Sequence, residues 1–309
     1  MRKDTDSLAS EFALIAEIFA PLAASPDAFD LTDDAAIIPS MPGHDLVLTA
    51  DMLSAGVHFF TGDAPAHIAQ KLLRANLSDL AAKGATPHGY LLTVALPRNI
   101  TMPWLREFAD GLHADQQTYG ITLLGGDTTA TDGPMTLSVT AMGWVPSGKM
   151  LRRSGARAGD GVYVTGTIGD SALGLMLRTG ALTGISPPYT DYLLNRYLLP
   201  QPRTAIAPHL HGPVTAAIDI SDGLAADLAH ICEASRVGAH VRAGDIPLSA
   251  AARACAAVSI TRLITGGDDY ELLLAIPPDK APALQQICAT HNVPLTRIGE
   301  FTAEPGIAF

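Results

Sequence analysis

The sequence predicts a mixed α/β (α+β) protein of two domains, and three observations support this. The length of 309 residues suits about two domains of ordinary size. Strand-like and helix-like apolar patterns alternate through both halves of the chain. Between them, residues 148–160 change to Gly, Arg, Ser and Lys with few large apolar side chains. We therefore expect an N-terminal domain over 1–148 and a C-terminal domain over 149–309.

In the first half, glycine and proline mark where the predicted elements end. Ser7 caps a helix, Gly84 and Gly120 follow two further helices, and Pro97 closes a strand. The predicted helices cover 7–20, 64–82 and 102–119, and the predicted strands cover 46–52, 90–96, 121–124 and 135–145.

The second half repeats this alternation. Short apolar runs predict strands at 162–164, 216–220 and 271–276. Amphipathic spacing predicts helices at 170–178, from Gly223 to Ser235, and at 279–291. Strands interleaved with helices in both domains are typical of layered α/β architecture.

Composition excludes several classes of protein. Lys plus Arg number 20 against 31 Asp plus Glu, a net charge of −11 without a basic block, so we expect no nucleic-acid partner. No apolar run reaches the ~18–20 residues that cross a bilayer, and the N-terminus lacks a signal-peptide pattern. Three scattered cysteines indicate reduced core thiols. We expect a cytoplasmic protein with no membrane partner.

Aspartate dominates the acidic residues, 24 Asp against 7 Glu. Each one alone is commonly a cap or a turn residue. Several, however, fall at expected strand or loop ends, some of them beside glycines, and one (Asp79) falls in a helix segment of small residues: Asp34, Asp51, Asp79, Asp127, Asp219, Asp222 and the pair Asp268–Asp269. Clustered carboxylates repel one another unless cations join them, and Mg²⁺ prefers such oxygen ligands. We therefore expect several Mg²⁺ ions and a polyphosphate substrate.

Other nucleotide and catalytic motifs do not fit. Residues 143–149 have the spacing of a Walker A loop, but Met150 stands where that motif needs a hydroxyl. No G-x-G-x-x-G follows a strand, and no Ser-His-Asp or Cys-His pattern indicates covalent catalysis. Lys149 and the pair Arg152–Arg153 are either phosphate contacts or a solvated basic turn.

Seven segments of the sequence form one ordered set: DDAA (33–36), LTADMLSAGVHF (48–59), NLSDLAAKGATP (76–87), GGDTT (125–129), RSGARAGDGVYVTGTIGDSALGL (153–175), IDISDGLAADL (218–228) and GGDDYEL (266–272). In their order and spacing, these segments together resemble the thiamine-monophosphate kinase family.

The resemblance implies a two-domain fold of the aminoimidazole-ribonucleotide-synthetase type, a homodimer whose N-terminal strands form a barrel, and transfer of phosphate from ATP to thiamine monophosphate. It assigns metal ligands, nucleotide contacts and substrate contacts. The metal ligands are Asp34, Thr49, Asp51, Asp79, Asp127, Asp219 and Asp222; the ATP contacts are Asp34, Gly126, Asp127, Arg153 and Ser221; the substrate contacts are His58 and Asp268. No side chain is expected to act as catalytic acid or base.

The chain departs from the family pattern in places, and alternatives stay open. Asp268 stands where the family usually has Glu, and the closing segment with an aromatic residue over the thiamine is not in the sequence. One alternative is another ATP-dependent synthetase of the superfamily. A second is a non-catalytic protein that binds thiamine phosphates or nucleotides.

Overall fold

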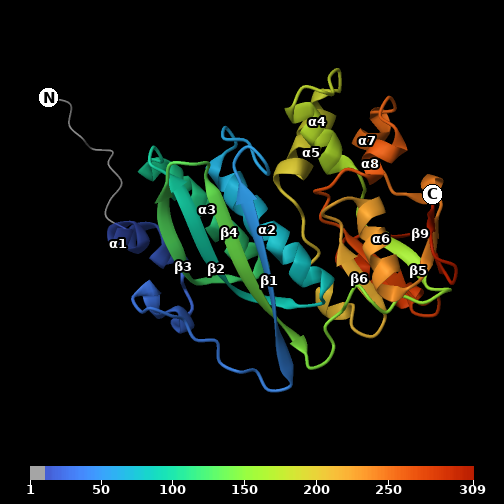
Figure 1. Cartoon of the computed structure of the whole chain (residues 1–309), viewed down its shortest axis with the longest axis horizontal. Helices are drawn as coiled ribbons and strands as arrows, with labels where there is room; N and C mark the ends of the chain where they lie inside the picture. The colour runs from blue at the N-terminus through green and yellow to red at the C-terminus, as the bar shows by residue number, and fades with distance from the viewer. Residues whose placement is uncertain (1–10) are drawn as a thin grey trace. The chain divides into compact units, whose positions relative to one another are not determined.

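The computed structural model describes residues 11–309, which form two compact units (Figure 1). Among the described residues, unit 1 comprises 11–76 and 87–144, and unit 2 comprises 77–86 and 145–309. Ser7, the expected cap of the first helix, lies outside the described residues. From Glu11 on, the described residues form a short α1 (Glu11–Leu14), the π-helical turn Ile15–Phe19 and two 3₁₀ segments, Ala20–Leu22 and Pro26–Leu31.

Unit 1 is built on a four-stranded sheet in the order β1-β4-β2-β3. The strands are β1 (His44–Ser54), β2 (Thr86–Pro97), β3 (Thr122–Thr131) and β4 (Thr136–Pro146). β2 and β3 run parallel, which requires the crossover that α3 (Met102–Tyr119) supplies. Thr101 caps the start of α3, and Gly120 ends it with φ 65°.

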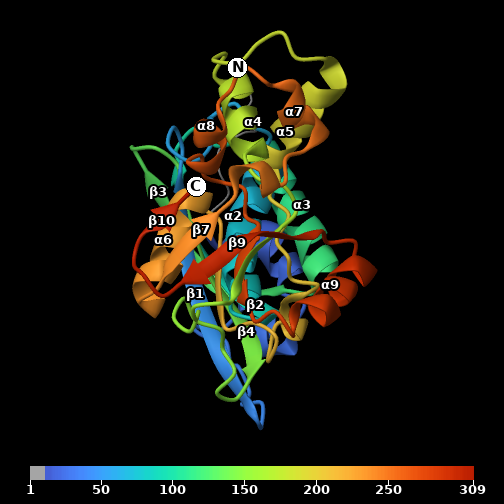
Figure 2. The ribbon, with the colours of Figure 1, turned by 90° about the vertical axis from the view of Figure 1, so that its right-hand side faces the viewer.

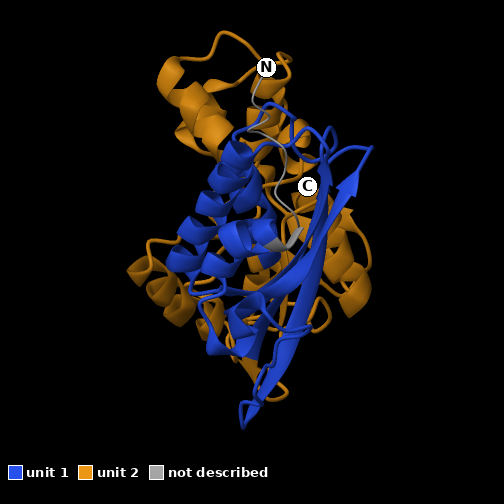
Figure 3. Cartoon of the chain, turned by 90° about the vertical axis from the view of Figure 1, so that its left-hand side faces the viewer, with its two compact units in different colours: residues 1–76, 87–144 blue, residues 77–86, 145–309 orange. Residues whose placement is uncertain are grey.

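The helices of unit 1 lie on one face of this sheet (Figure 3). The long helix α2 (Pro65–Ala82) carries Arg74, whose guanidinium pairs with buried Asp115 of α3 at 2.7 Å. Along β1, Val47 and Leu53 are buried, whereas Leu48 and Met52 are 59% and 60% exposed. Because side chains alternate along a strand, β1 presents apolar side chains on both faces of the sheet.

Unit 2 is built on a six-stranded sheet in the order β10-β7-β9-β5-β8-β6, in which only β10 and β7 are parallel. The strands are β5 (Gly161–Thr165), β6 (Ala216–Asp219), β7 (Gly238–Val241), β8 (Leu272–Ile276), β9 (Leu295–Thr302) and β10 (Ile307–Ala308). The helices are α4 (Asp170–Arg178), α5 (Pro187–Leu198), α6 (Leu224–Ser235), α7 (Ala250–Ala254), α8 (Ile260–Ile264) and α9 (Ala281–Thr290).

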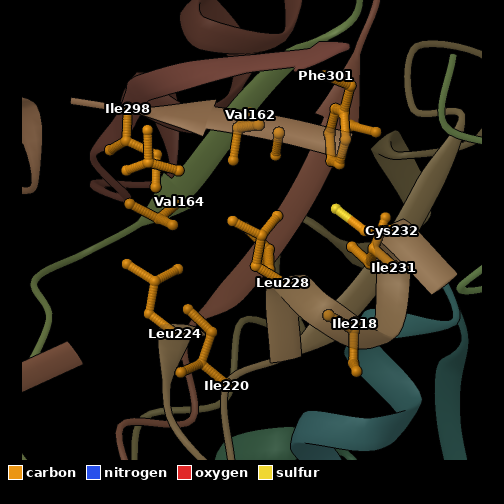
Figure 4. Close-up of a cluster of buried hydrophobic side chains, with 14 of the residues drawn as sticks. Val162, Val164, Ile218, Ile220, Leu224, Leu228, Ile231, Cys232, Ile298 and Phe301 are labelled. Atoms are coloured by element: carbon orange, nitrogen blue, oxygen red, sulfur yellow. The ribbon is translucent and has the colours of Figure 1, made fainter. Parts of the chain in front are cut away.

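Both faces of this sheet are covered, which explains why β5, β6 and β8 are buried throughout. Val162 and Val164 of β5 join the cluster beneath α6, and Tyr163 between them joins the cluster beneath α9. Figure 2 shows α6 and α9 on opposite sides of β9. Figure 4 shows Leu224, Leu228 and Ile231 of α6 directed toward the strands.

Each hydrophobic cluster of unit 2 contains one cysteine. Cys232 lies in the cluster of α6, Cys288 in that of α9, and Cys255 in a third cluster formed by α4, α5, α7 and α8. All three thiols are free and buried. Burial raises the pKa of Cys232 and of Cys288 to about 11, and it also raises the pKa of Cys255.

Two expectations about excluded classes can be compared with the structure. Gly143 to Pro146 belong to β4, and Lys149 is not followed directly by a helix, since the next element is the strand β5. These residues therefore do not form a phosphate-binding loop. Over the described range 11–309, no helix combines the length and apolarity of a membrane span.

Leu228→Ala should lower the free energy of unfolding by about 2–5 kcal/mol, because Leu228 is fully buried beneath the sheet of unit 2. Urea unfolding followed by circular dichroism measures this. The matched control is Leu175→Ala on α4, where the side chain is 39% exposed and the loss should stay below about 1 kcal/mol. Equal losses in both variants would contradict the position of Leu228 in the core.

Candidate functional site

Two carboxylates meet in unit 2, from Asp79 near the end of α2 and Asp219 at the end of β6. Asp219 is buried, and its Oδ2 accepts a hydrogen bond of 2.8 Å from the Ser78 hydroxyl. Burial and then the charge of Asp79 raise the pKa of Asp219 to about 7. The fold therefore holds two like charges close together at a cost in stability, an arrangement that a bound cation would relieve.

Basic groups lie beside this pair. Lys83, one turn after Asp79, is directed toward the Ala217 carbonyl at 3.4 Å. Burial lowers the pKa of Lys83, while Asp219 raises it, and the charge of Arg153 is near enough to lower it further. Carboxylates and cations thus share one region of unit 2, where both metal ions and phosphate groups could bind.

Two loops of unit 2 run side by side next to these acids. The amide of Asp268 donates to the Ser221 carbonyl at 2.9 Å, and that of Tyr270 donates to the Ile220 carbonyl at 2.8 Å. A Cβ on Gly267 would lie 2.2 Å from the Ser221 carbonyl oxygen, so the close approach requires glycine there. Ser221, Asp222 and Asp268, assigned to different ligands by the sequence, are therefore joined through backbone bonds.

The Asp222 loop has its own anchor. The carboxylate of Asp227, in the first turn of α6, accepts from the amides of Asp222 and Gly223 at 3.1 Å each. Burial, followed by the charge of Asp222, raises the pKa of Asp227 to about 6. Asp222, Asp227 and His230 also place ligand atoms within 4.8 Å of one another, although Asp227 is occupied by this backbone contact. Sequence reasoning missed Asp227, whose signal is an acid in the first turn of a helix.

In unit 1, Thr49 and Asp51 lie on the same side of β1, on the face that carries the buried Val47 and Leu53. The Asp51 amide donates to the Asn76 side chain at 3.1 Å, and the Asp51 carbonyl accepts from Ser138 at 3.1 Å. The sequence ends this strand near Asp51, whereas the structure continues it to Ser54. Asp51 is therefore fixed within a strand and not at its end.

Asp127 also lies inside a strand, β3, opposite Thr93 of β2. The preceding Gly126 is required, because a Cβ there would lie 1.7 Å from the Leu92 carbonyl oxygen. In the order β1-β4-β2-β3, Asp51 and Asp127 occupy the two edge strands. Three strand spacings of about 4.8 Å separate these strands. The sheet of unit 1 does not bring the two acids together.

The remaining expected residues of unit 1 lie in exposed connections. Asp34 follows the segment Pro26–Leu31, and its amide donates to the Asp33 carboxylate at 2.8 Å. The Nδ1 atom of exposed His58 accepts from the Ser54 amide at 3.1 Å. In the neutral ring this contact leaves the proton on Nε2, which makes that atom a hydrogen-bond donor.

A test of the acid pair compares Asp219→Asn with the natural protein in metal-free buffer. The folded-state pKa of Asp219, about 7, lies above its ordinary value of 3.8, so the natural protein loses stability as pH rises from about 4 to 7. The Asn side chain still accepts from Ser78 but carries no charge. Its stability relative to the natural protein should therefore increase by about 2–3 kcal/mol between pH 5 and pH 7.

Urea unfolding in EDTA at the two pH values measures this change. The exposed Asp191→Asn variant serves as the control and should follow the pH profile of the natural protein. A stability difference between Asp219→Asn and the natural protein that does not vary with pH would contradict the like-charge pairing.

Comparison with known families covers nearly the whole chain. Residues 32–145 match the AIR synthase related protein, N-terminal domain, and residues 157–309 match the C-terminal domain of the same family. A protein named thiamine-monophosphate kinase from Caulobacter vibrioides is 42% identical over 306 residues, which cover 97% of this chain and 86% of that protein.

Solved structures agree. The crystal structure of thiamine-monophosphate kinase from Stenotrophomonas maltophilia K279a is 40% identical, has a TM-score of 0.87 and covers 97% of this chain and 96% of that one. The structure described as AaThiL complexed with AMPPCP and TMP is 28% identical, has a TM-score of 0.78 and covers 96% of this chain and 89% of that one. These matches confirm the expected two-domain fold of the aminoimidazole-ribonucleotide-synthetase type, and the chain belongs to the thiamine-monophosphate kinase family.

Proposed function

We propose that the protein transfers the γ-phosphoryl group of ATP to the phosphate of thiamine monophosphate, giving thiamine diphosphate and ADP. The observation that carries this is the 42% identity, over 97% of the chain, to a protein named for the same reaction. The complex of a relative with AMPPCP and TMP supports both substrates. An oxygen of the acceptor phosphate forms a bond to the γ-phosphorus, and the bond to the bridging oxygen breaks with its electron pair leaving on ADP.

Such a transfer needs positioning and charge neutralisation more than a general base, because the acceptor phosphate is already anionic. We assign the ATP contacts to Asp34, Gly126, Asp127, Arg153 and Ser221, and the thiamine monophosphate contacts to His58 and Asp268. Lys83, whose pKa responds to the charges of Asp219 and Arg153, adds a half-buried cation beside these residues. The Nε2 atom of His58 would donate to an acceptor oxygen.

The acidic residues suit Mg²⁺. Burial and then the charge of Asp79 raise the pKa of Asp219, so a divalent ion would stabilise the charged pair, whose metal-binding atoms are all carboxylate oxygens. We assign the ions to Asp34, Thr49, Asp51, Asp79, Asp127, Asp219 and Asp222. When bound, Mg²⁺ neutralises phosphate charge and orients the reacting groups. A cytoplasmic location stays a prediction.

The function is tested by ADP release from ATP and Mg²⁺ with and without thiamine monophosphate, with the products separated by chromatography. We expect ADP release to require thiamine monophosphate and to yield an equal amount of thiamine diphosphate. Binding of thiamine monophosphate without turnover would favour the non-catalytic alternative. ADP release that ignores thiamine monophosphate would favour another synthetase of the superfamily.

We further propose a homodimer in which the sheet of unit 1 pairs with its copy. β1 and β3 are edge strands of 11 and 10 residues, long enough to invite pairing. Leu48, Met52 and Leu91 on this sheet are 59%, 60% and 38% exposed. Two such sheets joined edge to edge would close an eight-stranded barrel and cover these side chains. β1 of one copy would then lie beside β3 of the other.

Subunit complementation tests this arrangement. Asp51→Asn and Asp127→Asn should each abolish turnover, since each removes a ligand charge. If the two acids of one site come from different copies, mixed dimers of the two variants regain one intact site. Equal mixing should then restore about a quarter of the natural activity. Turnover is measured after the two variants are mixed, with and without a dissociation step, and sedimentation verifies that dimers are present. If turnover does not recover, both acids of a site lie in one copy.

A further inference from the structure

Unit 2 contains a buried ionic cluster that the proposed chemistry does not use. Glu271 is fully buried, and its Oε1 accepts from Arg196 at 3.0 Å. Arg203 forms a two-pronged contact with the same carboxylate, with Nε 2.6 Å from Oε2 and Nη2 bonded to Oε1. The Thr165 hydroxyl donates to Oε2 at 2.7 Å. Four donated hydrogen bonds thus converge on one carboxylate, a set that fixes the position and orientation of the group.

The segment just before Glu271 has a strained backbone conformation. Asp268 and Tyr270 adopt φ values of 68° and 51°, in the left-handed region that non-glycine residues seldom occupy. A non-glycine residue in this region is strained and keeps that conformation only when its surroundings impose it. Asp268 is also the residue that we assign to the acceptor substrate.

The ionic cluster supplies these surroundings. Arg196, which binds Glu271, also lies 3.3 Å from the Asp269 carbonyl. The Asp269 carboxylate accepts from the amides of Gly169 and Ser171 at the start of α4, at 2.7 and 3.3 Å. The Glu271 carbonyl accepts from the Ile220 amide at 2.8 Å. Asp268 is therefore held on both sides, by the cluster at 269 and 271 and by the Ser221 loop.

The packing around the carboxylate leaves little freedom. Gly166 has φ 56°, and a Cβ there would lie 2.1 Å from Oε1 of Glu271. An ion pair buried so completely adds little net stability compared with apolar packing, but it defines one geometry. The cluster is thus better explained by the geometry it imposes on the 266–271 loop than by the stability it supplies.

We propose that Glu271, held by Arg196 and Arg203, is a positioning residue that sets the place of Asp268 and thereby the affinity for the thiamine phosphate acceptor. This rests on the proposed function. The loop that carries the ATP contact Ser221 has an anchor of its own, because Asp227 holds the next two amides, those of Asp222 and Gly223. Loosening Glu271 therefore affects the acceptor more than ATP.

Glu271→Gln tests the inference, since it keeps the shape of the side chain and removes its charge. We expect KM for thiamine monophosphate to rise about tenfold while KM for ATP stays within about twofold, the same selectivity as in Asp268→Ala. Arg203→Lys keeps the positive charge but loses the two-pronged contact, and it should shift KM in the same direction by less. This second variant also serves if Glu271→Gln does not fold.

The matched control is Asp115→Asn in unit 1, which removes the carboxylate of an equally buried two-pronged pair with Arg74. It should lower Tm without changing the ratio of the two KM values. If Glu271→Gln lowers Tm but leaves both KM values unchanged, or raises both equally, the cluster has only a structural role.

The natural protein is measured in the same series, by turnover and by calorimetric binding of thiamine monophosphate. If the natural protein turns over but the variants do not change the ratio of the two KM values, this inference alone is overturned. Absence of both turnover and thiamine monophosphate binding in the natural protein overturns the proposed function as well. If the natural protein binds without turnover, the ratio of dissociation constants replaces the ratio of KM values.

Discussion

The repulsion between Asp79 and Asp219 is the constraint on which the site in unit 2 depends. Asp79 lies near the end of α2 and Asp219 at the end of β6, so the two backbones keep the carboxylates in the same region of unit 2. Ser78 and Lys83 offset part of the cost. A surface pair of acids would separate or be screened by salt, whereas burial makes this repulsion persist. The region is therefore prepared for positive charge before any ligand arrives.

Next to that pair, two loops are positioned by backbone contacts more than by side-chain contacts. The Ile220–Gly223 and Gly266–Glu271 segments approach so closely that a Cβ on Gly223 would lie 2.9 Å from the Gly266 carbonyl oxygen. The backbone bonds between the two segments set the spacing of the two loops. The side chains assigned to nucleotide and acceptor thus share one frame, while each loop retains a buried carboxylate of its own, Asp227 or Glu271, as its anchor.

Much of the fold was predictable because its signals are local. The predicted helix 102–119 matches the structure, because its two caps, Thr101 and Gly120, stand next to it in the sequence. α5, β7 and β9 were not predicted. α5 does carry apolar residues at helical spacing (Tyr189, Leu193 and Tyr197), whereas β7 has only four residues and the buried side chains of β9 do not alternate along the strand. The barrel and the boundary at 148/149 stay predictions.

The candidate site likewise has features that could be predicted from the sequence and features that could not. The acids could be selected by their residue type and by the family resemblance, and the pairing of Asp79 with Asp219 agrees with that choice. The spatial separation of Asp51 from Asp127 could not be read from the chain, because it follows from strand order. Glu271, Arg196 and Arg203 were missed for a related reason, since buried ion pairs join residues about 70 positions apart, without any local spacing.

The three cysteines give unit 2 an internal set of chemical reporters. Each hydrophobic cluster holds one thiol, and burial keeps that thiol protonated and shielded. A thiol in this state reacts with an alkylating reagent only when its own cluster opens. Alkylation kinetics resolved by mass spectrometry would therefore follow the opening of the α6 layer, the α9 layer and the α4–α5–α7–α8 group as three separate events in the unmutated protein.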